Sequence, residues 1–283
     1  MIYIPFLGAI ALSAGTILEK LLLKKKKLEV TLYQTASFLS IILLMVPLLF
    51  FFWKMDSGAW ELKNILIFLG VIASAVIANF LALYALKWEK VTNTEPARIL
   101  EPMLVIVLAI IFNLFIQGFQ ETNIKLVIPA LIAAVALIFP HIKKHHLRIN
   151  KYILAAIFGS FFFALELVLS KLILDLYSPI SFYFLRCLFV FLMSLILFRP
   201  DFKILNKKIS FNILIIGLVW IVYRIAIYFG YMKYGIIFTT LIVMISPIMI
   251  YIFAGRFLKE KLNWKNILSS VIIIACVVYS LFS

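Results

Sequence analysis

Ten apolar runs alternate with short, charged connections along the chain, and this alternation is the strongest pattern in the sequence. Each run has about 18 to 25 residues, the length of helix that crosses a hydrocarbon core about 30 Å thick. The pattern therefore predicts an all-α membrane protein with ten transmembrane helices. The expected spans are residues 2–23, 31–53, 64–86, 91–116, 124–141, 152–174, 179–198, 210–232, 235–255 and 264–282.

Two stretches of the chain resemble each other at a constant offset. Residues 8–20 read GAIALSAGTILEK and residues 159–171 read GSFFFALELVLSK, and further on EP at 101–102 corresponds to SP at 246–247. Five spans precede the basic linker around residue 145 and five follow it. An odd number of spans in each copy reverses the second copy in the membrane, as in the inverted repeats of secondary transporters. The sequence predicts two inverted five-helix repeats, residues 1–145 and 146–283.

Composition narrows the class of protein further. Hydrophobic residues make up 65% and charged residues 14% of the 283 positions, against roughly 45–50% and 25% in soluble domains. We therefore expect a multi-pass protein of the cell membrane. The two cysteines lie in apolar runs, and their spacing indicates neither a disulfide framework nor a metal site.

The basic residues are distributed unevenly between the connections. The formal charge of +15 comes from 27 Lys and Arg against 12 Asp and Glu, and 18 of those 27 lie in the connections after the odd-numbered spans. Such enrichment is typical of cytoplasmic loops. It predicts that both termini lie outside the cell and that the basic loops contact anionic lipid rather than nucleic acid.

Several motifs resemble the EamA-like families of the drug/metabolite transporter superfamily. They are the lysines that end the first and sixth spans, the SPISFYFLR run at 178–186 and the GRFLKEKLNW run at 255–264. The resemblance covers essentially the whole chain and implies two EamA-like repeats. It also implies a secondary transporter that exports a small metabolite or drug-like solute by alternating access.

The chain departs from the pattern of these families in two places. No arginine in the second span corresponds to Arg186, and the first half has Gln120 where the second has Glu260. Members are usually drawn with both termini in the cytoplasm, which is the alternative to the orientation that the loop charges predict. Lys20 and Lys171, which end their spans, are expected to extend to the membrane interface in a structural role.

The fourth span carries ionisable residues at intervals of three. Glu95, Arg98 and Glu101 lie on one side of a helix, and the cost of a charge inside a bilayer marks them as functional candidates. We expect Arg98 and Glu101 to line a central cavity, with Glu101 as a candidate for proton coupling. The alternative is a structural ion pair of Glu95 and Arg98. Pro102 removes a helical hydrogen bond and, with its counterpart Pro247, is a candidate hinge.

The eighth span presents a stripe of aromatic residues around one arginine. Trp220, Tyr223, Arg224 and Tyr228 recur at helical spacing. A guanidinium among aromatic rings suits a solute with a carboxylate, a phosphate or an aromatic ring. We expect these four residues to line the cavity; the alternative is that the rings pack between helices and Arg224 pairs with a structural acid.

Three further polar residues lie inside the predicted spans. Glu166 is the expected partner of Arg224 or Arg186, either as a cavity residue and second candidate for proton coupling or in a structural ion pair. Arg186 is expected to have a structural or gating role. Asn79 is a candidate cavity residue, although a bond to a helix backbone would explain it equally well.

The sequence lacks the parts of an enzyme. It contains no metal-ligand cluster within a span, no nucleophile motif and no ATP-binding loop, so we expect no catalytic residue, no metal and no cofactor. The histidines at 141, 145 and 146 lie in a basic linker without acidic or cysteine partners. We expect a monomer or weak dimer whose partners are a small-molecule solute, membrane lipid, and a coupled proton or counter-solute.

Two alternative functions remain open at this stage. An antiporter of anionic nucleotide-sugars or organic phosphates is favoured by Arg98, Arg186 and Arg224. A membrane-embedded lipid enzyme or lipid-carrier flippase belongs to a different functional class.

Overall fold

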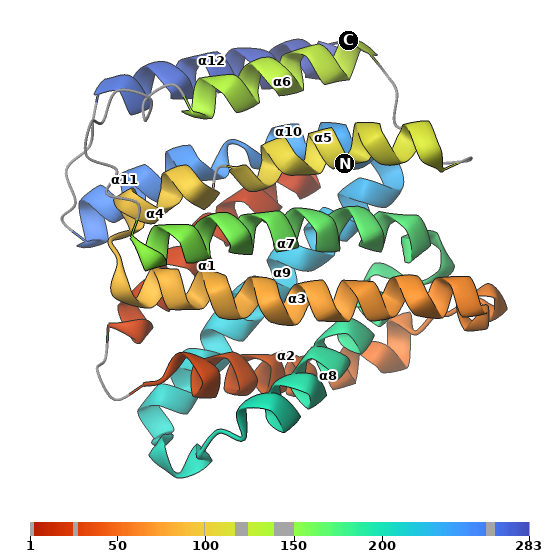
Figure 1. Cartoon of the computed structure of the whole chain (residues 1–283), viewed down its shortest axis with the longest axis vertical. Coiled ribbons are helices and arrows are strands. Elements are labelled where there is room, and N and C mark those ends of the chain that lie inside the picture. Colours follow the sequence, from red (N-terminus) through yellow and green to blue (C-terminus); the bar gives the residue numbers. More distant parts are fainter. Residues whose placement is uncertain are drawn as a thin grey trace.

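The computed structural model describes residues 3–24, 28–98, 100–116, 124–138, 150–258 and 264–282 (Figure 1). Within these residues every regular element is a helix, apart from an isolated antiparallel bridge between Met55 and Tyr177. The all-α prediction is therefore confirmed for the described residues. The α-helices are α1 (Tyr3–Leu23), α2 (Val30–Phe52), α3 (Leu62–Trp88), α4 (Val91–Arg98), α5 (Leu100–Phe115), α6 (Ile124–Ile138), α7 (Lys151–Ile173), α8 (Pro179–Phe198), α9 (Lys207–Tyr234), α10 (Ile236–Val243), α11 (Ser246–Leu258) and α12 (Trp264–Phe282), and the 3₁₀ turns are η1 (Ser57–Trp60), η3 (Leu174–Leu176) and η4 (Phe202–Ile204).

Seven helical segments within the described residues are long and apolar enough to cross a membrane. They are Tyr3–Leu23, Val30–Phe52, Leu62–Trp88, Lys151–Leu176, Pro179–Phe198, Lys207–Tyr234 and Ile236–Leu258. Three shorter apolar helices are Leu100–Phe115, Leu126–Ala136 and Val271–Ser280. The chain is thus a multi-pass membrane protein, and the count of ten crossings stays a prediction.

The ninth span contains a break close to its proline. It forms α10 and α11 with a turn at Met244 and Ile245. Pro247 then falls in the first turn of α11, where the missing N–H group has no helical partner to lose. In the fourth span, α4 and α5 lie on either side of Ile99, which is outside the described residues, so the kink expected at Pro102 stays a prediction.

Helices of the first half pack mainly against helices of the second half. The helix α3 lies along α7, α1 along α9, α2 against α8 and α6 against α12 (Figure 1). The largest buried hydrophobic cluster draws side chains from both halves. The fold is thus held together mainly by contacts between the two halves of the chain rather than by contacts within each half.

The repeated glycines lie where these helix pairs approach most closely. A Cβ atom at Gly8 of α1 would be 3.3 Å from the Cβ of Ala226 in α9. At Gly159 of α7 it would be 3.2 Å from the backbone nitrogen of Ala82 in α3. Close backbone approach over small residues is the usual way in which membrane helices associate, so the same residue serves equivalent crossings in both halves.

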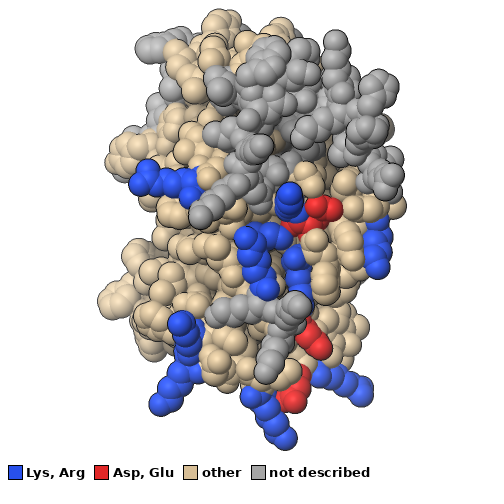
Figure 2. Space-filling model, turned by 90° about the vertical axis from the view of Figure 1, so that its left-hand side faces the viewer, with Lys and Arg blue, Asp and Glu red and all other residues tan. Residues whose placement is uncertain are grey.

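Basic side chains gather at one end of the molecule. The ends of α3 and α8 and the starts of α7 and α9 lie toward the left of Figure 1, and Figure 2 shows the Lys and Arg side chains on that face. In Figure 1 the labels N and C lie away from this face. The described basic residues near these helix ends therefore share one side of the bundle, as a membrane orientation set by charge requires.

Glu89 joins two helix ends on this basic face. Its carboxylate accepts hydrogen bonds from Asn93 Nδ2 at 2.8 Å, from the Lys90 N–H at 3.0 Å and from Asn150 Nδ2 at 3.1 Å. Partial burial raises the pKa of Glu89, but these hydrogen bonds and the nearby Lys20 charge outweigh burial and lower the pKa below 4.5. Since Asn150 caps α7, the Glu89 carboxylate ties the end of α3 to the start of α7.

The two lysines that end the repeated motif have different environments. Lys20 is only 5% exposed and donates to the carbonyl oxygens of Leu86 at 2.6 Å and of Glu89. Lys171 instead lies 3.7 Å from Asp175, whose side chain is 70% exposed. The expectation that Lys20 extends to the interface is thus wrong: carbonyl groups at the end of α3 lack helical partners, and its ammonium group satisfies them.

We expect Lys20→Met to destabilise the protein by about 2–3 kcal/mol, because it leaves buried carbonyl groups without a charged donor. The matched control is Lys171→Met, whose pair with the exposed Asp175 should contribute about 0–1 kcal/mol. Unfolding of the two purified variants in detergent measures the difference. Equal losses of stability would contradict this interpretation.

Candidate functional site: a cavity between the two halves

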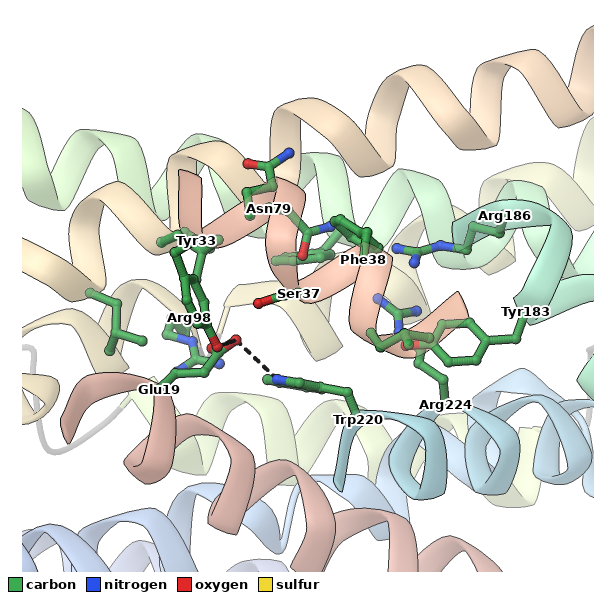
Figure 3. Close-up of a pocket in the computed structure, with 16 residues that line it drawn as sticks. Glu19, Tyr33, Ser37, Phe38, Asn79, Arg98, Tyr183, Arg186, Trp220 and Arg224 are labelled. Atoms are coloured by element: carbon green, nitrogen blue, oxygen red, sulfur yellow. Dashed lines mark hydrogen bonds between the residues drawn. The ribbon is translucent and has the colours of Figure 1, made fainter. Parts of the chain in front are cut away.

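A cavity of ≈ 70 Å³ lies among α1, α2, α3, α4, α7, α8 and α9. Figure 3 shows Arg186 and Arg224 toward one end of it, and Glu19 with Tyr33 and Trp220 toward the other. Both halves of the chain contribute to the wall. The charged and polar lining residues are Glu19, Tyr33, Gln34, Ser37, Asn79, Arg98, Tyr183, Arg186, Trp220 and Arg224.

Glu166 of α7 is completely buried beside the cavity and contacts both arginines. Its Oε1 accepts a hydrogen bond from Arg186 Nε at 2.8 Å, and its Oε2 lies 3.0 Å from Arg224 Nη2. The second contact has the distance of an ion pair without the angle of a hydrogen bond. Tyr228 completes the cluster, since its hydroxyl donates to Oε1 at 3.2 Å. The sequence offered Arg186 or Arg224 as the partner, and the structure pairs Glu166 with both.

Aromatic rings enclose the two guanidinium groups. Arg186 lies 5.9 Å from the centre of the Phe38 ring, and Arg224 lies 5.8 Å from that of Phe163 and 5.6 Å from that of Tyr223. Rings at this distance attract a cation through their quadrupole. They also limit access of water, so the charges at this end of the cavity interact strongly.

The arginine cluster carries one more positive charge than negative charge. Two guanidinium groups share the single Glu166 carboxylate, and the buried Nη2 of Arg186 and Nη1 of Arg224 have no hydrogen-bond partner in the described part of the chain. Buried donors usually have partners. A carboxylate or phosphate oxygen in the adjacent cavity would supply both the acceptors and the missing charge.

Glu19 is the charged cavity residue that the sequence analysis did not single out. Its Oε1 accepts hydrogen bonds from Tyr33 at 3.0 Å and from Trp220 Nε1 at 2.9 Å (Figure 3). The signal for it was a difference between the two repeated motifs, because Glu19 corresponds to Ser170 in the second copy. Its neighbour Lys20 drew attention to the motif as a helix end instead.

The structure contains a second cavity of ≈ 50 Å³. Glu101 and Pro102 line this second cavity together with Pro247, whereas Arg98 lines both cavities. Arg98 Nη2 also donates to Thr16 Oγ1 at 3.2 Å. The expected single cavity is thus divided in this conformation, with Arg98 at the junction.

The aromatic stripe of α9 is divided in the same way. Trp220 and Arg224 line the first cavity and Tyr223 lines the second, while Tyr228 is fully buried against Glu166. Asn79 fits both of its interpretations, because it lines the first cavity and its Nδ2 donates to the Ala75 carbonyl at 2.7 Å.

Some expectations fall outside the described parts of the structure. The side chain of Glu95 is not described, so its proposed pair with Arg98 stays a prediction. Gln120, Glu260 and the three histidines of the linker also lie outside the described residues.

The comparison with known families concerns the second half of the chain. Residues 150–282 match the model of the EamA-like transporter family. This half of the chain is EamA-like. The match confirms the resemblance to the drug/metabolite transporter superfamily, to which that family belongs. The matched residues include Glu166, Arg186 and Arg224.

Solved structures share the fold of this chain, and 28 of their chains match. One crystal structure superposes with a TM-score of 0.69 over 98% of this chain and 94% of that chain, at 14% sequence identity. At this identity the similarity shows the fold alone. None of the curated proteins compared with the chain matches it.

Replacing Glu166 should show how strongly the arginine cluster depends on it. We expect Glu166→Gln to lower the free energy of unfolding by about 3–5 kcal/mol, because two buried guanidinium groups lose their counter-charge. The matched control is Asp175→Asn near the end of the same helix, where an exposed pair contributes about 0–1 kcal/mol. Denaturant unfolding in detergent measures both, and a loss for Glu166→Gln no larger than the control would contradict the assignment.

Proposed function

We propose that this protein is a secondary transporter that exports a small anionic solute by alternating access around the first cavity. The observation that carries the proposal is the buried pair of Arg186 and Arg224. Among the described residues they share the single acid Glu166, and both line the cavity and have buried nitrogen atoms without a hydrogen-bond partner. An intramembrane charge of this kind is costly unless it serves a ligand or an ion pathway. The family match supports transport as the activity.

The packing of the helices supports the inverted arrangement that alternating access needs. The contact of α1 with α9 has its counterpart in α7 with α3, and the contact of α5 with α7 has its counterpart in α11 with α1. The pairs α2–α8 and α6–α12 are their own counterparts. We therefore propose two inverted five-helix repeats, residues 1–145 and 146–283, which rock against each other around the shared cavity.

The size of the cavity favours a small anion over a nucleotide-sugar. Its ≈ 70 Å³ is about half of the 150 Å³ that accommodates benzene in an engineered protein cavity, so an anion with one ring requires some widening of the cavity on binding, and a nucleotide-sugar far more. A carboxylate or phosphate with a small apolar part suits the arginines and the surrounding rings. The antiporter of nucleotide-sugars would need a much wider state, and the family match favours transport over a lipid enzyme or a lipid-carrier flippase.

The distribution of basic residues supports an orientation in the cell membrane. We propose that the basic end in Figure 2 faces the cytoplasm and that both termini face outward. The connections between α2 and α3 and between α7 and α8 then lie on the outer face.

Arg224→Gln should abolish anion binding, because it removes the guanidinium fork and its charge. We expect acetate, inorganic phosphate or benzenesulfonate to raise the melting temperature of the wild-type protein, and uncharged benzenesulfonamide to have no effect. In proteoliposomes, Arg224→Gln should reduce counterflow of the stabilising anion at least about tenfold, with Arg224→Lys intermediate because Lys lacks the bidentate geometry.

The matched control for Arg224 is Arg256→Gln, which removes an exposed arginine from α11. It should bind and transport like the wild type. The proposal of an anionic solute would be wrong if benzenesulfonamide stabilised the protein to the same extent as benzenesulfonate. It would also be wrong if the Arg224→Gln variant transported the anion normally.

A set of hydrogen bonds closes the proposed outer face. The Asp56 N–H donates to the carbonyl of Leu176 at 2.7 Å, and the Ser178 N–H donates to that of Lys54 at 3.1 Å. The Ser178 hydroxyl also donates to the Phe52 carbonyl at 2.6 Å. These bonds join the connection after α2 to the connection after α7, and opening toward the outside would have to break them.

A disulfide across this contact should stop transport. Met55 and Tyr177 face each other in the antiparallel bridge, and Cα atoms in a pair without mutual hydrogen bonds lie about 4.5 Å apart, within the range of a disulfide. We expect Met55→Cys with Tyr177→Cys, in a background with Cys187→Ala and Cys276→Ala, to lose benzenesulfonate counterflow on oxidation. Reduction should restore it, and each single cysteine variant should ignore the oxidant. Full transport with the disulfide formed would exclude opening at this point.

A further inference from the structure

Glu19 differs from Glu166 in how the protein holds its charge. Glu166 contacts two guanidinium groups, whose positive charges favour the ionised form of its carboxylate. Glu19 has no ion pair among the described residues and accepts hydrogen bonds only from Tyr33 and Trp220, which are neutral donors. An acid held in this way can gain and lose a proton without breaking a salt bridge.

The two oxygen atoms of Glu19 have separate roles. Both hydrogen bonds, from the Tyr33 hydroxyl and from Trp220 Nε1, go to Oε1. The carboxylate lines the cavity, and no described group donates a hydrogen bond to Oε2. A proton can therefore bind to Oε2 while Oε1 keeps both of its donors, and a proton taken up from cavity water completes this step without any other bond changing.

The helix packing places Trp220 at Glu19. Gly15 lies one turn before Glu19 on α1, and a Cβ atom there would be 3.3 Å from Cε2 of the Trp220 indole. Because Gly15 lacks that atom, the indole lies flat against α1 and its N–H group reaches the carboxylate. The contact therefore joins α1 of the first half to α9 of the second.

The groups that face Glu19 come from several helices. The helix α2 presents the Tyr33 hydroxyl and α4 presents the Arg98 guanidinium, which also bonds to Thr16. Arg224 of α9 lines the far end of the same cavity, while α10 and α11 contribute only uncharged residues to the two cavities. Among the described residues, the acidic and basic side chains that line the cavities or pair within them are three arginines and three glutamates, namely Arg98, Arg186, Arg224, Glu19, Glu101 and Glu166.

We propose that Glu19 binds a proton together with the anionic solute, so that the protein moves an anion and a proton as an electroneutral pair. With Glu19 ionised, the three glutamates balance the three arginines, and the cavity has little net attraction for an anion. Protonation of Glu19 raises the charge by one and favours anion binding at Arg186 and Arg224. This inference rests on the proposed transport of an anion, and it replaces Glu101 and Glu166 as the candidates for proton coupling.

The coupling must be reciprocal, because proton and anion bind to one protein. Acidic solution should strengthen anion binding, and anion binding should favour protonation of Glu19. Export of an anion down its own gradient would then carry a proton out of the cell. An inward proton gradient would drive the same pair inward.

The test uses the purified full chain with benzenesulfonate, which keeps its charge at all the pH values used. The emission of Trp220, taken as the difference between the wild type and Trp220→Phe, reports on the Glu19 carboxylate before any anion is added. We expect this signal to follow a single titration curve across the range of pH in which the protein stays folded. The curve should be absent in Glu19→Gln and unchanged in the control Glu61→Gln, which alters an exposed acid at the start of α3.

Benzenesulfonate affinity is then measured at the acidic and alkaline ends of that range. We expect the wild type and Glu61→Gln to bind more tightly in acid by a factor of roughly 5 to 150, the usual range of coupling between two sites. Glu19→Gln resembles the protonated acid, so it should bind tightly and equally at both ends of the range.

Three results would overturn the inference. A Trp220 signal that does not change with pH would show that Glu19 does not titrate. A clear titration with equal benzenesulfonate affinity at both pH values would reject the coupling and leave anion transport standing. No benzenesulfonate binding at either pH, with or without Glu19→Gln, would reject the anionic solute of the proposed function together with this inference.

Discussion

Glu166 occupies a buried position between Arg186 of α8 and Arg224 of α9, and much of the second half is arranged around it. Each of these charges would be costly in a membrane on its own. Together they tie α7, α8 and α9 to one point and leave one guanidinium charge without a counter-charge. The proposed function depends on that surplus, because it gives the cavity a chemical preference that aromatic walls alone would not supply.

Glu19 provides the opposite kind of acid within the same cavity. Its partners are a phenol and an indole rather than guanidinium groups, so its charge can change while the helices stay in place. The two carboxylates therefore differ in their partners, which are arginines for Glu166 and neutral donors for Glu19. In the proposed mechanism Glu166 organises the anion site, and Glu19 binds the proton.

Hydrogen bonds at the two ends of the bundle indicate how the halves are held. The carboxylate of Glu89 joins α3 to the cap of α7 on the basic face, and backbone bonds from Asp56 and Ser178 join two connections on the other face. The interior between these ends consists of helix pairs that cross over small residues such as Gly8 and Gly159. Rocking of one half against the other would therefore exchange end contacts while the crossing points act as pivots.

The sequence by itself determined the all-helical membrane class, the resemblance to EamA-like transporters and the residues worth examining, because apolar length and repeated motifs are local properties of the chain. It indicated that Glu166 would meet an arginine, and it marked Pro102 and Pro247 as candidate hinges. It did not determine that Lys20 caps α3, that Glu101 and Arg224 line different cavities, or that Glu19 meets Trp220. Those outcomes depend on which helices cross and at which residues they cross. Only tertiary packing brings residues about 200 positions apart, such as Glu19 and Trp220, within hydrogen-bonding distance.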